Sequence, residues 1–483
     1  MSKVRVRIPP SPTGLLHIGT VRTALYNYLF AKHNGGTMVF RIEDTDKERG
    51  TKEFERDIID GLVKLGIAGD EGVHIPGSKG YRQSERTDVY ASDLKKLLTE
   101  DRAYYCDCTK ERLEAMRKDQ EAKKLPPRYD GTCANKKLKA GVIRLRVPAD
   151  RGDIKWNDLV RGEIVIHARE LDDFVIARSP NDPLYNLTVV ADDHDMEITH
   201  VIRGEDHISN TPKQILIFET LGWQVPEYAH LPLILNEDKS KLSKRKNKVS
   251  VADYLAEGYL PDALLNFLAL LGWNTPDEQE IFTMKELIEK FTLDRVHKGG
   301  AIFDLKKLDW INGEYIKKMI TEDADKFYEL AKPFIEGKVP TKDKALIKKI
   351  LKDPDFAGRF KKLSEIPEGL APLFSPLPDY PLELIVREKF QITPEILKEV
   401  LTKGIEVVNG MDWRKGDSTK NQAISDAFTG IVGTLGLKNG QVLWPIRVAL
   451  SGLEKSPNFA TLAVYLGKEE VLKRLQFGLK KVG

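Results

Sequence analysis

The sequence predicts an α/β N-terminal half with a parallel sheet, followed by a mainly α-helical C-terminal half. In the first part of the chain, short β-branched segments alternate with amphipathic segments of helical period, an order that produces a parallel sheet. In the last part, the apolar positions recur with a period near 3.6 rather than 2. The chain has 483 residues, and roughly 150 residues per domain predicts about three domains.

The N-terminal part carries the alternating elements. Strands are predicted over residues 4–8 and 37–42, and helices over residues 17–33, 52–65 and 90–100. In such a fold the ligand binds at the carboxyl ends of the strands. The chain has neither a Gly-x-Gly-x-x-Gly fingerprint nor a Walker loop, which disfavours a dinucleotide enzyme and a P-loop NTPase.

Residues 106–187 are expected to form an insertion into this fold. Its predicted elements are a charged helix and two strands bounded by Gly and Pro, over residues 109–124, 142–147 and 163–167. The alternating pattern then resumes, with two strands and a helix predicted over residues 188–191, 198–202 and 211–221. We therefore expect one catalytic domain, residues 1–105 and 188–249, that is split by the insertion.

Helices are predicted for most of the remaining chain. An apolar segment, residues 260–273, lies in a region that we place at 250–320. The last region, 321–483, has room for two subdomains, and its main helices are predicted over residues 393–403, 421–435 and 458–476.

Composition excludes several classes of protein. No apolar run approaches the roughly 20 residues that span a bilayer, so we expect no membrane association. The N-terminus enters a predicted strand without an apolar signal core, so we expect a cytoplasmic protein. Three cysteines cannot form a disulfide framework. The net charge of +3 is too small to predict nucleic-acid binding, although lysines cluster locally.

Two separate motifs predict an ATP site. The first, Arg7-Ile-Pro-Pro-Ser-Pro-Thr-Gly-Leu-Leu-His17-Ile-Gly19-Thr20, leads from a strand through a loop into a helix. A helix N-terminus offers N–H groups and a positive dipole to phosphate. His17 can donate to phosphate oxygens whose charge grows during attack on the α-phosphate. The second, Lys241-Leu-Ser-Lys244-Arg245, supplies ammonium groups that can neutralise a departing pyrophosphate.

These motifs resemble the HIGH and KMSKS signatures of class I aminoacyl-tRNA synthetases, and in detail the chain resembles bacterial glutamyl-tRNA synthetases. The first motif carries the family's His-Ile-Gly-Thr variant. Two further segments carry the likeness, and all of them occur in the order of that family: Phe40-Arg-Ile-Glu-Asp-Thr-Asp46 and Val201-Ile-Arg-Gly-Glu-Asp-His207. The resemblance implies that the insertion holds the acceptor end of tRNA, that 250–320 contacts the tRNA stem, and that 321–483 binds the anticodon. Glutaminyl enzymes end in β-barrels instead, so the helical C-terminus favours a glutamyl enzyme.

Glutamate has two carboxylates and one ammonium group, so its pocket needs basic groups and an acid. Arg203 can pair bidentately with the γ-carboxylate, and related glutaminyl enzymes lack arginine there. By resemblance, Arg7 and Tyr185 join Arg203, while Glu43 and Ser11 hold the α-ammonium.

The resemblance also implies the residues that bind ATP. His17 and Lys244 are expected at the triphosphate, with Lys241 assisting, and Mg²⁺ shields the phosphates. Gly19 allows close approach of the adenosine, and Thr20 replaces the second histidine of the general signature. Two further residues are expected to line the nucleotide pocket, Glu205 and His207.

Cys106-Asp-Cys108 and Cys133 resemble a zinc site that some glutamyl enzymes carry in this insertion. Structural zinc normally has four ligands, and Asn135, two residues after Cys133, is a poor one. Two interpretations stay open: a zinc site that Tyr129 completes, or three structural thiols that remain after a lost site.

The predicted activity is ATP-dependent attachment of L-glutamate to tRNA(Glu) by a monomer. Two alternatives share this chemistry: an enzyme that also charges tRNA(Gln) with glutamate, and a glutaminyl enzyme, which Arg203 opposes. A third, from another class, is a catalytically silent tRNA-binding scaffold. The presence of His17, Glu43, Arg203 and Lys244 argues against a silent protein.

Overall fold

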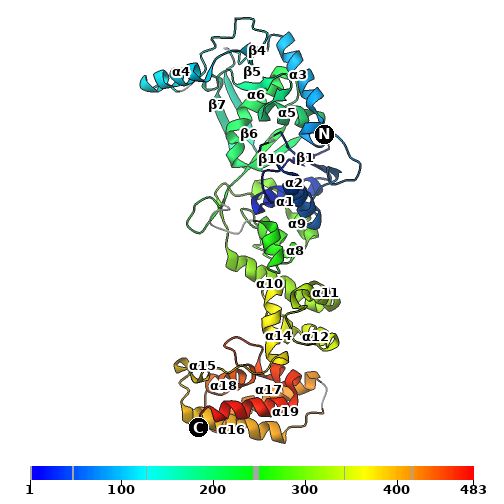
Figure 1. Cartoon of the computed structure of the whole chain (residues 1–483), viewed down its shortest axis with the longest axis vertical. Coiled ribbons are helices and arrows are strands. Elements are labelled where there is room, and N and C mark those ends of the chain that lie inside the picture. Colours follow the sequence, from blue (N-terminus) through cyan, green and yellow to red (C-terminus); the bar gives the residue numbers. More distant parts are fainter. Residues whose placement is uncertain are drawn as a thin grey trace. The chain divides into compact units, whose positions relative to one another are not determined.

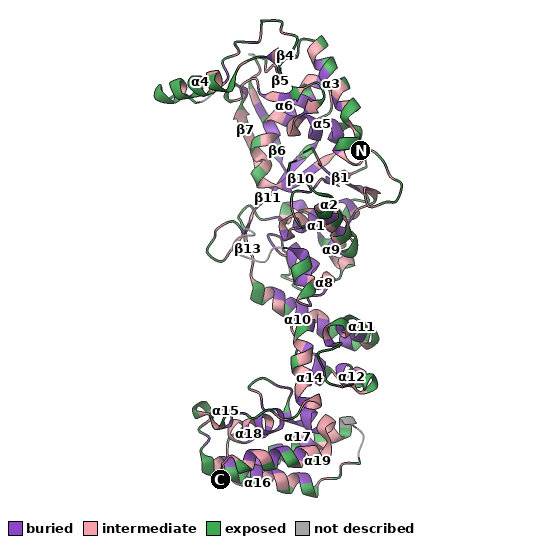
Figure 2. Cartoon of the chain, viewed as in Figure 1, coloured by how far each residue is buried: buried purple, intermediate pink, exposed green. Residues whose placement is uncertain are grey.

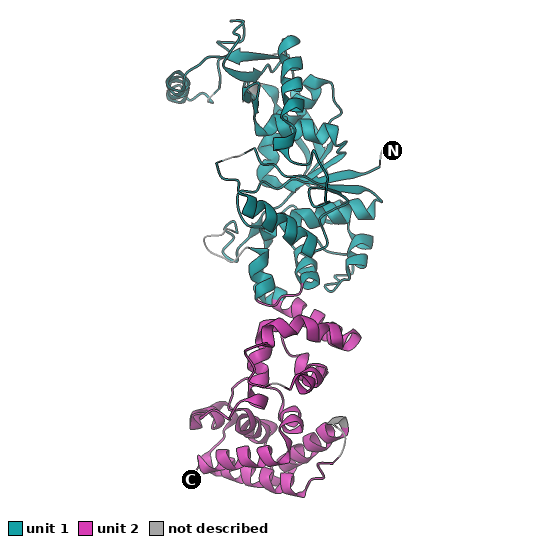
Figure 3. Cartoon of the chain, turned by 45° about the vertical axis from the view of Figure 1, so that its right-hand side comes forward, with its two compact units in different colours: residues 1–256, 261–308 teal, residues 257–260, 309–483 magenta. Residues whose placement is uncertain are grey.

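The computed structural model describes residues 3–45, 48–126, 128–148, 150–242, 250–341, 343–414 and 417–482. The chain forms two compact units (Figure 3): Met1–Ala256 with Pro261–Leu308, and Glu257–Leu260 with Asp309–Gly483. The finer boundaries predicted within these units stay predictions.

The first unit contains the predicted parallel strands (Figure 1). β1 (Arg5–Ile8), β2 (Thr37–Phe40) and β3 (Glu71–Gly72) pair in parallel in that order. β10 (His200–Gly204) and β11 (Glu227–Leu231) form a second parallel pair. Thr199, directly before β10, bonds to the backbone of Arg5 in β1. β10 therefore lies beside β1, and the predicted α/β class is confirmed.

Helix α1 (Ile18–His33) follows β1 and is largely buried. Its N-cap is His17, so the helix begins one residue later than predicted. Helices α2 (Lys52–Lys64) and α3 (Thr87–Thr99) lie within the predicted helical segments or overlap them closely. The loop between β1 and α1 carries the Pro-rich motif, and it therefore stands at the carboxyl end of β1.

One predicted strand is wrong. Residues 188–191 lie inside helix α5 (Tyr185–Asp195), which precedes β10, while α6 (Thr211–Leu221) is a helix as predicted. Every residue from Leu187 to Asp193 is buried. A short run that is buried all round has no polar face, so its periodicity does not distinguish a strand from a buried helix.

The predicted insertion, residues 106–187, contributes a hairpin and three strands of an antiparallel sheet, whose fourth strand, β4 (Ala103–Cys106), ends where the insertion begins. β4, β5 (Val142–Leu145), β8 (Val175–Ser179) and β9 (Asp182–Pro183) form the sheet. Helix α4 (Lys110–Ala122) has no buried residue (Figure 2).

The hairpin joins the insertion to the catalytic sheet. Its strands are β6 (Asp153–Asp158) and β7 (Gly162–His167), and β6 pairs with β11 at Asp158 and Tyr228. This junction gives the strand order β10-β11-β6-β7. The sequence analysis did not predict β6.

The rest of the first unit consists of short elements. They are β12 (Ile234–Leu235), α7 (Val251–Ala256), α8 (Pro261–Ala269), α9 (Met284–Lys290) and β13 (Ala301–Ile302). The buried helix α8 packs near α1, where Tyr26 donates a hydrogen bond to the carbonyl of Ala269 across 3.0 Å.

The described residues of the second unit form helices joined by loops, and no strand, as predicted. Helix α10 (Leu305–Glu322) begins in the first unit, which ends at Leu308, and continues in the second, which resumes at Asp309. Shorter helices follow: α11 (Ala324–Ile335), α12 (Lys344–Leu351), α13 (Pro354–Ala357), α14 (Ile366–Phe374) and α15 (Leu382–Ile385). A hydrophobic core of this unit is built mainly from four longer helices: α16 (Pro394–Gly410), α17 (Asp417–Leu435), α18 (Asn439–Ser451) and α19 (Phe459–Lys480). Within the described residues, no helix is long and apolar enough to cross a membrane.

Candidate active site

A cavity of about 380 Å³ in the first unit brings most of the predicted site residues together. It lies at the carboxyl ends of β1 and β10, beside the start of α1. The predicted residues that line it are Arg7, Ser11, His17, Gly19, Thr20, Glu43, Tyr185, Arg203, His207 and Lys241. Glu205 is not among the lining residues, and Lys244 lies outside the described residues.

The nucleotide side of the cavity is formed by the start of α1. His17 Nδ1 accepts a hydrogen bond from the Gly19 N–H across 2.9 Å. Because Nδ1 is an acceptor, the neutral ring carries its hydrogen on Nε2, which makes Nε2 a donor. A Cβ at position 19 would lie 3.1 Å from His17 Nδ1, so glycine lets the ring lie against the helix start.

Glu205 and His207 occupy different surroundings from each other. Glu205 accepts a hydrogen bond from the Leu233 N–H at 2.8 Å and pairs with Arg161, so it holds neighbouring loops together. His207 lies in the cavity wall, with Nδ1 3.0 Å from the hydroxyl oxygen of Tyr185. Burial, with the nearby charge of Arg203, lowers the pKa of His207 to about 4, so its ring is neutral at pH 7.

Lys241 is an exposed cation at the cavity mouth. Its ammonium lies 3.4 Å from the carboxylate of Asp206, and both side chains are at least half exposed. Such a pair in water is weak, so a phosphate group can compete for the ammonium.

Two buried arginines form the basic side of the cavity. Arg7 Nε lies 3.2 Å from Asp193 Oδ1, while Arg7 Nη1 has no hydrogen-bond partner within the described residues. Arg203 donates to three neutral acceptors: Nε to His230 at 3.2 Å, Nη1 to Gln214 at 2.8 Å and Nη2 to Thr211 at 2.8 Å. No carboxylate of a described residue is ion-paired with it. These two guanidinium groups therefore keep donors and positive charge for an anionic ligand.

The buried acid among the cavity's lining residues is Glu43, which follows the end of β2. Its Oε1 accepts a hydrogen bond from Arg41 Nη2 at 3.2 Å. Burial raises the pKa of Glu43 to about 7, although Arg41 and Arg7 act in the opposite direction. A cationic ligand would restore the ionised carboxylate, because it adds an opposite charge to a buried site.

Tyr185 stands at the first residue of α5, within the wall that Arg7 and Arg203 share. Burial raises the pKa of its hydroxyl to about 12, so the phenol is protonated and serves as a neutral donor or acceptor.

Sequence reasoning missed several buried residues behind this wall. Asp193 accepts from Arg41 Nη1 at 2.5 Å as well as from Arg7, so one carboxylate holds two arginines of the site. Asp192 accepts from Arg86 at 2.7 Å and Tyr90 at 2.8 Å. The acidic run 192–195 inside an apolar segment was the available signal, because buried carboxylates require partners.

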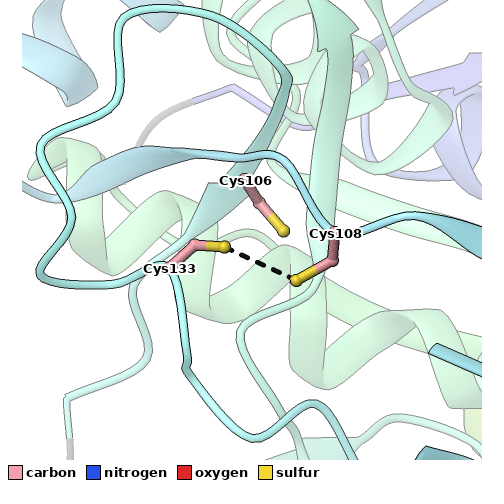
Figure 4. Close-up of side chains that lie close together, drawn as sticks. All are labelled: Cys106, Cys108 and Cys133. Carbon is pink, nitrogen blue, oxygen red and sulfur yellow. Dashed lines mark hydrogen bonds between the residues drawn. The ribbon is translucent and has the colours of Figure 1, made fainter. Parts of the chain in front are cut away.

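The three cysteines gather in the insertion, as Figure 4 shows. The sulfur atoms lie within 4.8 Å of one another, and Cys108 Sγ is 3.5 Å from Cys133 Sγ. The hydroxyl oxygen of Tyr129 lies 3.4 Å from Cys106 Sγ and 3.6 Å from Cys108 Sγ. Hydrogen bonds from Tyr129 and Arg144 outweigh the effect of burial and lower the pKa of Cys106 to about 7.

A second group that sequence reasoning missed lies in the second unit. The guanidinium groups of Arg387 and Arg447 each lie 4.7 Å from the centre of the Trp444 ring. Burial lowers the pKa of Arg447, and the charges of Arg359 and Arg387 act in the same direction. The arginines are spread over 359–447, so no compact motif marks them.

Two family models match the chain. The model described as tRNA synthetases class I (E and Q), catalytic domain, matches residues 3–310. A model described as an anticodon binding domain matches residues 326–479.

Individual proteins are similar over the whole length. A glutamate–tRNA ligase of Clostridium tetani is 43% identical over 496 residues, which cover 100% of this chain and 98% of that protein. A glutamate–tRNA ligase of Carboxydothermus hydrogenoformans is 43% identical over 491 residues, which cover 98% of this chain and 99% of that protein. A crystal structure of a glutamate tRNA ligase from Elizabethkingia meningosepticum, in complex with its amino acid, has a TM-score of 0.82 at 34% identity and covers 100% of both chains. The chain therefore belongs to the class I aminoacyl-tRNA synthetases, in the family of glutamate–tRNA ligases.

Proposed function

We propose that this protein uses ATP to attach L-glutamate to tRNA(Glu), through glutamyl-adenylate. The observation that carries the choice of amino acid is the buried guanidinium of Arg203, whose acceptors within the described residues are all neutral. A buried cation without a counter-ion favours a ligand that brings a negative charge. The names of the similar proteins support the same choice.

The cavity suits glutamate at both ends of the molecule. Arg203, Arg7 and Tyr185 would receive the γ-carboxylate, and Glu43 with Ser11 would receive the α-ammonium. Glutamine would leave the arginine charge uncompensated, since an amide is neutral. This arrangement leaves the α-carboxylate to point toward the nucleotide side of the cavity.

ATP would enter as its Mg²⁺ complex beside the start of α1. His17 would donate from Nε2 to phosphate oxygens, Gly19 and Thr20 would lie against the adenosine, and Lys241 would approach the pyrophosphate. His207 would contribute a neutral ring to the wall. Lys244, the other expected catalytic lysine, is outside the described residues.

The reaction then needs positioning rather than a covalent intermediate on the protein. A carboxylate oxygen of glutamate attacks the α-phosphorus, the bond to the bridging oxygen breaks, and pyrophosphate leaves with the electron pair. In the second step, the terminal ribose hydroxyl of tRNA attacks the activated carbonyl carbon and AMP leaves. Donors and cations fixed around the phosphates stabilise the charge that develops.

The insertion has a donor set that suits a structural zinc ion. At a tetrahedral zinc, sulfur and oxygen ligands lie about 3.5 to 3.8 Å apart, because the bonds are about 2.3 and 2.0 Å long. The contacts among Cys108, Cys133 and Tyr129 fall near these separations. Cys106, Cys108, Cys133 and Tyr129 would hold the ion, and its role would be to fix the loops of the insertion.

The partner is a tRNA, and two features support its binding. The second unit matches an anticodon-binding model, and it contains the group of arginines around Trp444. Guanidinium groups and aromatic rings suit phosphates and unstacked bases. Charging of tRNA(Gln) in addition to tRNA(Glu) is the second candidate, because the glutamate cavity lies in the first unit and the anticodon-binding match lies in the second. We further propose that the protein acts as a monomer.

Exchange of labelled pyrophosphate into ATP tests this proposal. The purified chain is assayed with glutamate or glutamine, with and without tRNA. Exchange that depends on glutamate is the expected result. Exchange with glutamine alone would overturn the choice of amino acid, and no exchange under any condition would favour the silent scaffold.

A further inference from the structure

The guanidinium of Arg203 is held in one orientation without losing its charge. Its three hydrogen bonds to His230, Gln214 and Thr211 use three of the five N–H donors of arginine. Two donors are left for a ligand. A carboxylate in place of any of these acceptors would fix the group equally well, but it would compete with the carboxylate of the substrate.

The acceptor on Nε is a histidine whose own protonation is fixed. His230 is fully buried, and its Nε2 accepts from Arg203 at 3.2 Å. Its Nδ1 lies 2.5 Å from Asp158 Oδ2, and because a carboxylate only accepts, Nδ1 carries the hydrogen. Burial lowers the pKa of His230 and the positive charge of Arg203 acts in the same direction, although Asp158 acts against them. Because Nε2 accepts a hydrogen bond while Nδ1 donates one, the ring is neutral. Arg203 on one side and Asp158 on the other therefore both favour the tautomer with the hydrogen on Nδ1.

Asp158 is itself held in place. Its Oδ1 accepts from the backbone N–H groups of Arg161 at 2.9 Å and His230 at 3.1 Å. These hydrogen bonds, with the one from the His230 ring, outweigh burial and lower the pKa of Asp158, so its carboxylate is ionised. The three residues come from β10, β11 and β6, which are neighbours in one sheet.

We propose that Asp158 and His230 form a positioning pair that fixes Arg203 as the receptor for the γ-carboxylate of glutamate while leaving its charge uncompensated. The inference rests on the proposed function and extends it to two residues that do not line the cavity. His230 transmits the orientation imposed by Asp158, and its neutral ring keeps the negative charge of Asp158 away from Arg203. Asp158 belongs to the hairpin that joins the insertion to the catalytic sheet. The pair therefore makes recognition of glutamate depend on that junction.

Two substitutions of His230 separate its two hydrogen bonds. The amide nitrogen of asparagine in His230→Asn can replace Nδ1 as the donor to Asp158, but it provides no acceptor for Arg203. The longer side chain in His230→Gln can place an oxygen near Nε2 as the acceptor for Arg203, and it gives up the bond to Asp158. If the pair acts through Arg203, only the asparagine variant impairs binding of glutamate.

A third variant, Asp158→Asn, changes the tautomer without changing the volume. Its amide group can donate to Nδ1, which moves the ring hydrogen to Nε2, where it faces the N–H of Arg203. This variant should therefore behave like His230→Asn. His200→Asn is the matched control, since His200 lies on β10 and its ring packs against Phe30, outside the cavity.

The experiment measures KM for glutamate and for ATP by pyrophosphate exchange in the full chain, with thermal midpoints as a check on folding. We expect KM for glutamate to rise about 10-fold in His230→Asn and Asp158→Asn, and less than about 3-fold in His230→Gln and the control, with KM for ATP unchanged. Equal effects of His230→Asn and His230→Gln, or a parallel rise in KM for ATP, would overturn the inference. If Asp158→Asn does not fold, the two His230 variants decide the question. Failure of the unsubstituted chain to exchange with glutamate would contradict the proposed function instead.

Discussion

The guanidinium of Arg41 donates to the carboxylate of Glu43 across 3.2 Å, and both side chains are buried. The same guanidinium lies 2.5 Å from Asp193 and 3.7 Å from Asp192, and these two carboxylates also pair with Arg7 and Arg86, respectively. Glu43 faces the cavity and has a raised pKa. Burial causes this rise, so the ammonium group of an amino acid would stabilise the ionised form of Glu43 by adding a positive charge beside it.

The first prediction concerns Glu43→Gln in catalysis. The amide retains the volume but cannot offset the charge of the α-ammonium, so kcat/KM for glutamate should fall about 10- to 100-fold. KM for ATP should stay within about twofold, because the nucleotide side is untouched. Pyrophosphate exchange over a range of glutamate concentrations measures both constants. A variant with normal kcat/KM for glutamate would remove Glu43 from the site.

The second prediction concerns the same variant in stability. The pKa of Glu43 is about 7 in the folded chain and 4.5 ordinarily, so the folded state binds more protons between these pH values. The contribution of this group to stability therefore falls as pH rises through that window, and each pKa unit is worth about 1.4 kcal/mol. The glutamine of Glu43→Gln does not titrate, so the variant does not lose this stability. The thermal midpoint of the variant relative to that of the unsubstituted chain should therefore be higher at pH 8 than at pH 5. The same difference between the two proteins at both pH values would contradict the prediction.

The third prediction concerns Arg203→Gln. The substitution removes the buried charge, so kcat/KM for glutamate should fall at least about 30-fold. The preference for glutamate over glutamine should shrink as well, because a neutral pocket no longer rewards a carboxylate. Competition between the two amino acids in the exchange assay gives the ratio. Retention of the full preference would mean that another residue selects glutamate. Arg178→Gln serves as a control, since that arginine is exposed and does not line the cavity.

The fourth prediction concerns zinc in the insertion. Purified protein should contain about one zinc ion per chain, and Cys133→Ser should lose most of it and melt at a lower temperature. Tyr129→Phe should retain the fold but bind zinc more weakly, because it removes only the oxygen ligand. Elemental analysis gives the metal content. Protein without zinc, and a thermal midpoint that a chelator leaves unchanged, would favour three structural thiols.

The fifth prediction concerns Trp444 and its two arginines. If a base of tRNA stacks in this group, Trp444→Ala should raise KM for tRNA about 5- to 150-fold, the range expected for one stacked base. Arg447→Gln should weaken binding and reduce its dependence on salt, because one positive contact is lost. KM for ATP and for glutamate should not change. A variant that folds and charges tRNA with normal KM would exclude this surface.

The fold class and the motif residues were predictable because they depend on local patterns. The alternation of strands and helices led to the parallel sheet, and the Pro-rich loop before His17 marked the start of α1. Ten predicted site residues line one cavity, because β1, β2 and β10 end at the same edge of the sheet. Their individual roles stay predictions.

The remaining features depend on distant contacts. The strand predicted at 188–191 was wrong because a helix that is buried all round has the same apolar run as a buried strand. Asp158 and His230 could not be paired from sequence, since 72 residues separate them and only the strand order β11-β6 brings them together. β6 itself had an available signal in the sequence, because the apolar residues Ile154 and Trp156 alternate with polar residues.

The measurement that tests the central claim most directly is the charging of purified tRNA(Glu) and tRNA(Gln) with labelled glutamate and with labelled glutamine. We predict attachment of glutamate to tRNA(Glu) that requires ATP, and no attachment of glutamine to either tRNA. Attachment of glutamate to tRNA(Gln) as well would identify an enzyme that charges both tRNAs with glutamate. Attachment of glutamine, or of neither amino acid, would contradict the account.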